Sequence, residues 1–129
     1  MSNKQHTDMK VKLSTLWIVV MLNMIFADIL SIMVEFVNKN TINIPGDVMV
    51  TMAIAAVVTN IPILMIYFSR VLAYKINRIA NIVAAILTII YVIGGGDTAP
   101  HYLIMASIEV TCLLVILRSA WTWKISNSA

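Results

Sequence analysis

Charged residues are scarce in this chain. Asp, Glu, Lys and Arg make up 12% of its 129 residues, whereas hydrophobic residues make up 60%. Soluble domains carry about 25% charged residues, so this chain lacks the polar side chains that cover a surface in water. The composition therefore excludes an ordinary soluble domain and predicts a membrane protein.

Cysteine and histidine are nearly absent as well. The chain has a single cysteine, Cys112, which lies within an apolar run. One cysteine alone excludes an internal disulfide and a cysteine metal site. The two histidines take part in no His-x-x-x-His or Glu-x-x-His spacing, so we expect no metal. The chain also has no P-loop, no G-x-S-x-G and no C-x-x-C motif. We therefore expect no cofactor and assign no catalytic residue.

Four long apolar segments account for most of the chain, at residues 13–34, 48–69, 79–96 and 101–120. A helix of twenty-two residues, the length of the first segment, reaches about 33 Å and can cross the hydrocarbon core of a bilayer. The first segment exceeds the apolar region of a signal peptide, about 7–15 residues, so we interpret it as a retained span. In lipid, such segments with short connections form an antiparallel helical bundle. The prediction is an all-α integral membrane four-helix bundle, forming a single domain over residues 1–129.

Local signals mark the ends and one irregularity of these helices. Asp47 is suited to cap the second helix, because its carboxylate can accept hydrogen bonds from the first free amides. Pro62 leaves the carbonyl of Val58 without its helical partner, which predicts a kink. Residues 1–12 are polar and are expected to be frayed. The glycine run 94–96 predicts a tight turn before the fourth helix.

The basic residues predict the orientation of the bundle. Three precede the first span, three lie between the second and third spans, and two lie at the end of the fourth, so that only Lys39 falls on the other side. The positive-inside rule then predicts that both termini are cytoplasmic, in a multi-pass protein of a bacterial inner membrane. Because the basic residues are spread between spans, the net charge of +3 predicts no nucleic-acid partner.

Several polar residues lie within the predicted spans. Asp28, Tyr91 and Glu109, on three different spans, fall at similar depths on the outer side of the membrane midplane, given a rise of about 1.5 Å per residue. A charged side chain at such depth is costly, so these residues should face protein or water. With three further polar residues nearer the middle or the outer boundary, they form a predicted set of ligand- or proton-binding residues: Asp28, Glu109, Tyr91, Glu35, His101 and Asn60.

This set leaves three functional hypotheses open. Two carboxyl groups in a low-dielectric site can hold a proton at neutral pH, as proton-coupled transport requires. The leading hypothesis is a proton-linked carrier or binder of a small apolar or cationic molecule, centred on Asp28 and Glu109. The second is a non-catalytic accessory or assembly subunit, in which these acids only tie helices together. The third is a lipid- or quinone-modifying enzyme that also uses His101. A non-enzymatic role is favoured, and four short spans are compatible with a homodimer.

Residues 13–124 include three distinctive stretches: LSTLWIVVMLNMIFADIL, SRVLAYKINRIANI and HYLIMASIEVTCLLVILRSAWTWK. Together these stretches resemble a family of small, uncharacterised bacterial four-span membrane proteins, a likeness that implies the fold and no activity. The size and layout are also loosely similar to the DoxX-like group. The small multidrug transporters are similar in size, but their essential Glu lies early in the first span, whereas Asp28 lies late in it.

Overall fold

The computed structural model describes residues 3–38, 46–95 and 98–124. It contains four helices, α1 (Asn3–Val37), α2 (Val48–Val71), α3 (Tyr74–Gly94) and α4 (Pro100–Thr122). Each is long and apolar enough to cross a membrane, which confirms the predicted all-α class and makes this a multi-pass membrane protein. Three features of the sequence-based analysis lie outside the described residues: Lys39, Gly96 at the end of the third predicted span, and the tail 125–129.

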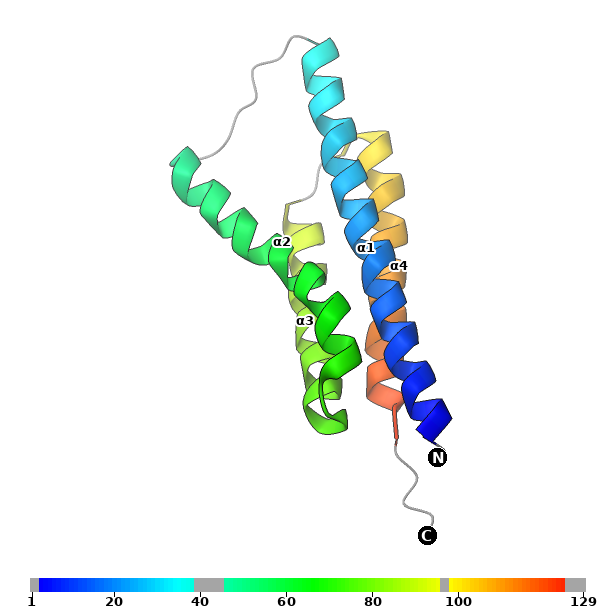
Figure 1. Ribbon diagram of the computed structural model, residues 1–129. Helices are drawn as coiled ribbons and strands as arrows, with labels where there is room; N and C mark the ends of the chain where they lie inside the picture. Colours follow the sequence, from blue (N-terminus) through cyan, green and yellow to red (C-terminus); the bar gives the residue numbers. More distant parts are fainter. Residues whose placement is uncertain (1–2, 39–45, 96–97, 125–129) are drawn as a thin grey trace.

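The four helices run up and down in chain order. Both α1 and α3 pack against α2 and α4. The start of α1 and the end of α4 lie at the same end of the bundle, as Figure 1 shows. We call this end, which carries Lys4 and Trp123, the termini end, and the other the opposite end. The cytoplasmic location of the termini stays a prediction.

Helix α1 begins ten residues earlier than the first predicted span. The polar stretch 1–12 was expected to be frayed, and this expectation is wrong from Asn3 onward. The cause is tertiary packing: Met9 packs against the core, and the ring of His6 lies 5.0 Å from that of Trp123 between centroids. At 35 residues, α1 is about 52 Å long and exceeds the hydrocarbon core of about 30 Å.

Helix α2 contains the bend expected from its proline. Asp47 caps its first turn, accepting hydrogen bonds from the amides of Met49 (2.8 Å) and Val50 (3.4 Å). Pro62 lies inside the helix, and Figure 1 shows α2 bending near its middle, so that its first half leans away from the other helices. All the residues of α2 that are buried, Pro62 among them, lie in its second half. The first half, residues 48–60, therefore forms an arm at the opposite end.

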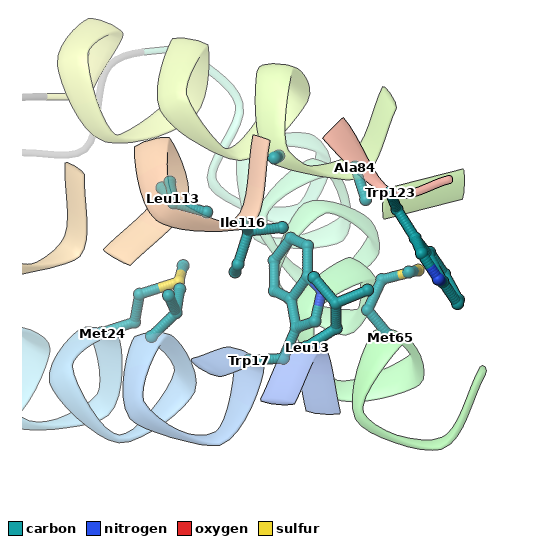
Figure 2. Packing of buried hydrophobic residues seen from close by; sticks show 10 residues of the cluster. Leu13, Trp17, Met24, Met65, Ala84, Leu113, Ile116 and Trp123 are labelled. Carbon is teal, nitrogen blue, oxygen red and sulfur yellow. The ribbon is translucent and has the colours of Figure 1, made fainter. Parts of the chain in front are cut away.

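The apolar core lies mainly in the half of the bundle nearer the termini end. Figure 2 shows Trp17 of α1 projecting across the interior toward Ile116 of α4, with Leu13 beside it. Two fully or nearly fully buried alanines of α3, Ala84 and Ala85, present only small side chains, which suits the close approach of helices in a membrane.

A network of buried polar side chains ties three helices together beside this core. Trp17 Nε1 of α1 donates to Asn81 Oδ1 of α3 at 2.7 Å, and Ser69 Oγ of α2 donates to the same oxygen at 3.2 Å. Asn81 Nδ2 donates to Asn77 Oδ1 at 2.7 Å, and Asn77 Nδ2 donates to the carbonyl of Ser69 at 2.8 Å. All four residues are fully buried. We call this set, Trp17, Ser69, Asn77 and Asn81, the amide network.

The termini end is closed by contacts between the ends of the helices. Arg78 of α3 donates from Nε to the carbonyl of Ala120 (2.9 Å) and from Nη2 to that of Trp121 (2.8 Å). The hydroxyl of Tyr74 donates to the carbonyl of Trp123 at 2.5 Å. These bonds satisfy carbonyls that the last turn of α4 would otherwise leave without partners. Hydrogen bonds thus hold the helix ends together at the termini end, whereas the arm of α2 has no buried residue at the opposite end.

Candidate functional site

Three polar residues from three helices line one small cavity. Asp28 of α1, Tyr91 of α3 and Glu109 of α4 surround a space of about 30 Å³. The rest of the lining is Met24, Ala27, Val92 and Tyr102. A cavity needs about 10–15 Å³ to hold one water molecule, so this space accepts a water or a small polar group. We call it the acid cavity.

The helical periodicity explains why one acid is buried and the other is not. On α4, Glu109 shares a face with Leu113 and Ile116, and its side chain is only 4% exposed. On α1 the buried stripe runs through Trp17, Met24 and Ala27, and Asp28 lies at the edge of that stripe, where it is exposed. Glu109 therefore forms the base of the acid cavity and Asp28 its mouth.

No residue of α2 lines the acid cavity. In the ring of helices, α2 lies between α1 and α3. Its first half leans away in Figure 1, and no residue of the described arm is buried. Of the two acids, Asp28 is therefore the more exposed one.

The acid cavity has the chemistry of a proton or cation site. Asp28, Tyr91 and Glu109 line the same small cavity, so the three groups are close enough to influence one another. Two carboxyl groups and a phenol offer hydrogen-bond acceptors, and a shared proton or a bound cation relieves the repulsion between the acids. Among residues 3–38, 46–95 and 98–124, no three His, Cys, Asp or Glu side chains group closely enough to hold a metal ion.

The other three predicted site residues lie outside the acid cavity. His101 Nε2 lies 3.1 Å from the hydroxyl of Ser31, and that serine is three residues beyond Asp28 on α1. Glu35 is half-buried one further turn toward the opposite end. Asn60 is exposed on α2, where its Nδ2 donates to the carbonyl of Ala56 in its own helix at 2.7 Å.

Sequence reasoning missed the role of Tyr102, which lines the acid cavity beside Val92. Its hydroxyl donates to the carbonyl of Val92 at 2.8 Å and so joins the start of α4 to the end of α3. The available signal was its spacing: Tyr102 precedes Glu109 by seven residues and lies on nearly the same face of α4. Tyrosine near a helix end is also typical of the membrane interface, which obscured that signal.

Comparison with known proteins identifies a family without assigning an activity. A model of DUF6326, described as a family of unknown function, matches residues 3–129, and the chain belongs to this family. Neither the curated proteins nor the solved structures include a significant match. The family match supports the predicted resemblance to an uncharacterised family. It gives no link to the DoxX-like group.

Proposed function

We propose that this member of the DUF6326 family is a proton-linked carrier or binder of a small apolar or cationic molecule in a bacterial inner membrane. The observation that carries the proposal is the convergence of Asp28 and Glu109, from the first and last helices, on the acid cavity. Acids inside a membrane are costly and are functional candidates by default. Because Asp28 and Glu109 line the same cavity, one proton or one cation bound there would interact with both acids.

Proton binding and cation binding are coupled because the proton and the cation compete for the same two carboxyl groups. An ionised carboxylate within the bilayer costs about 2.5–3.5 kcal/mol, and a second negative charge beside it adds repulsion. A proton or a bound ammonium group removes that cost, but the two compete for the same oxygens. Binding of a cation therefore displaces a proton, and by linkage an added proton weakens binding of the cation.

The asymmetry of the two acids gives the exchange a direction. Asp28, at the mouth, meets an incoming cation first, while Glu109, at the base, is sheltered from outside the bundle. If the termini are cytoplasmic, as the basic residues predict, both acids lie on the periplasmic side of the membrane midplane. The tight termini end then blocks the way to the cytoplasm in this conformation.

An accessory or assembly subunit is the second candidate function, and the arm of α2 favours it. Residues 48–60 present exposed apolar side chains such as Met49, Ile54 and Val57. A second copy or another membrane protein could pack there. The third hypothesis, an enzyme using both acids and His101, gains no support, because His101 does not line the acid cavity.

Binding of a small ammonium ion as a function of pH tests the proposal. Radiolabelled methylammonium is equilibrated with the protein in lipid nanodiscs, beside Asp28→Asn and Glu109→Gln, which keep the size of each side chain. We expect the wild-type affinity to fall about tenfold per unit of decreasing pH where one proton is displaced. Both variants should lose this dependence. Equal, pH-independent binding by folded wild type and variants would overturn the proposal.

A further inference from the structure

A second, larger cavity adjoins the acid cavity. It is a groove of about 480 Å³ on the side of α3 and α4 near the opposite end. Its lining is mostly apolar and includes Val92, Ile93, Leu103, Ala106 and Val110. Pockets that bind small organic molecules span about 300–1,000 Å³, so the groove has the size of a ligand site, whereas the acid cavity does not.

The polar atoms of the groove wall are already satisfied. The hydroxyl of Ser107 donates to the carbonyl of Leu103 in its own helix at 2.6 Å, and that of Tyr102 donates to the carbonyl of Val92 at 2.8 Å. A hydrocarbon chain in the groove would therefore leave neither of these hydroxyl groups without a partner. The groove therefore suits an alkyl chain, and these two hydroxyl groups have no free hydrogen to donate to a polar chain.

Tyr102 and Val92 separate the two cavities. Both residues line the groove and the acid cavity, and the hydrogen bond between them closes the partition from α4 to α3. One side of the partition is thus apolar and open along the surface of the bundle. The other side holds two carboxyl groups.

We propose that the groove and the acid cavity form one two-part site for an amphipathic cation, an alkyl chain that ends in an ammonium group. The chain lies in the groove, and the ammonium group passes Tyr102 to reach Asp28 and Glu109. This inference rests on the proposed function and adds the class of ligand to it. An anionic amphiphile of the same length is excluded by the two acids, and a neutral one gains nothing from them.

The experiment compares amphiphiles that share one chain. Radiolabelled dodecylamine, dodecanol and dodecanoate are each equilibrated between empty nanodiscs and nanodiscs that contain the protein, so that partition into lipid cancels. We expect enrichment of dodecylamine alone, with loss of this enrichment in Asp28→Asn and Glu109→Gln. Equal enrichment of dodecanol would overturn the proposal, because the acids would then play no part.

A groove variant separates this inference from the proposed function. Ala106 is half-buried in the groove and away from the acid cavity, and Ala106→Phe fills the groove. We expect it to weaken dodecylamine binding by about tenfold, the effect of overpacking a fitted site, and to leave methylammonium binding within about twofold. Ala53→Phe, on the exposed arm of α2, is the matched control and should change neither. Should Ala106→Phe fail to fold, Ala106→Leu is the milder substitute.

Each remaining outcome decides one question. If methylammonium binding depends on the acids but Ala106→Phe leaves dodecylamine binding unchanged, the two-part site is wrong and the proposed function stands. If methylammonium binding does not depend on the acids, the proposed function fails and the inference fails with it. If Ala106→Phe instead changes the oligomeric state measured by light scattering, the groove is an interface between copies and the two-part site is overturned.

Discussion

Removing the side chain of Asn81 should strongly destabilise the bundle. In Asn81→Ala, Trp17 Nε1 loses its acceptor and Asn77 Oδ1 loses the donor that Asn81 Nδ2 provides. All three residues have no exposed surface, so neither water nor lipid headgroups can replace the lost partner. The change therefore removes the partner of two buried donors, Trp17 Nε1 and Ser69 Oγ, and of one buried acceptor, Asn77 Oδ1, and these groups lie on three different helices.

The expected loss of stability follows from these three groups. A buried polar group without a partner costs about 1–3 kcal/mol, whereas an average hydrogen bond between membrane helices is worth only about 0.6 kcal/mol. The burial of the amide network favours the larger figure. We expect Asn81→Ala to lower the free energy of unfolding by about 2–4 kcal/mol.

A second asparagine provides the control for this prediction. Asn60 is exposed and donates only within its own helix, so Asn60→Ala should change stability by about 0.5 kcal/mol or less. Unfolding by SDS titration in mixed micelles, followed by circular dichroism, measures both variants. A loss below about 0.5 kcal/mol for Asn81→Ala, or equal losses for the two variants, would refute the reasoning about the amide network.

Three further predictions concern the ends and the bend of the bundle. Pro62→Ala restores an amide donor for the carbonyl of Val58 and should straighten α2. Spin labels on the arm and on α4 should then lie closer together in pulsed EPR. An unchanged distance between the labels would show that Pro62 does not set the bend. Arg78→Ala removes two hydrogen bonds to the last turn of α4 and should cost about 1–3 kcal/mol, seen as faster amide exchange in that turn, while unchanged exchange would contradict it. Tyr102→Phe removes the bond to Val92 and should speed dodecylamine association; a slower rate would argue against a partition there.

The helices themselves could be predicted because their signals are local. Long apolar segments define the spans, Asp47 marks a helix start, and Pro62 marks a bend, each within a few residues of sequence. The similar depth of Asp28 and Glu109 follows from a fixed rise per residue once the span limits are set. These features need no knowledge of how the helices pack.

Features that depend on packing could not be predicted in the same way. The helical start of α1 packs against Trp123, at the other end of the chain. The polar sequence of residues 1–12 by itself predicts a frayed end. The small cavity that Asp28 lines exists only because α1, α3 and α4 meet there, which no pattern within α1 predicts. Asn60 was assigned to the site on depth alone, but its amide is held by its own helix. The groove exists only where α3 and α4 meet, so the sequence around Tyr102 does not predict that this residue lies between two cavities.

The number of protons released on binding tests the central claim most directly. Titration calorimetry of methylammonium into the protein near neutral pH, in two buffers of different ionisation enthalpy, yields this number. The account predicts roughly one proton released per ammonium ion bound by the wild type and none released by the folded Asp28→Asn/Glu109→Gln double variant. Binding without proton release in the wild type, or the same release from the double variant, would contradict the claim that these two acids exchange a proton for a cation.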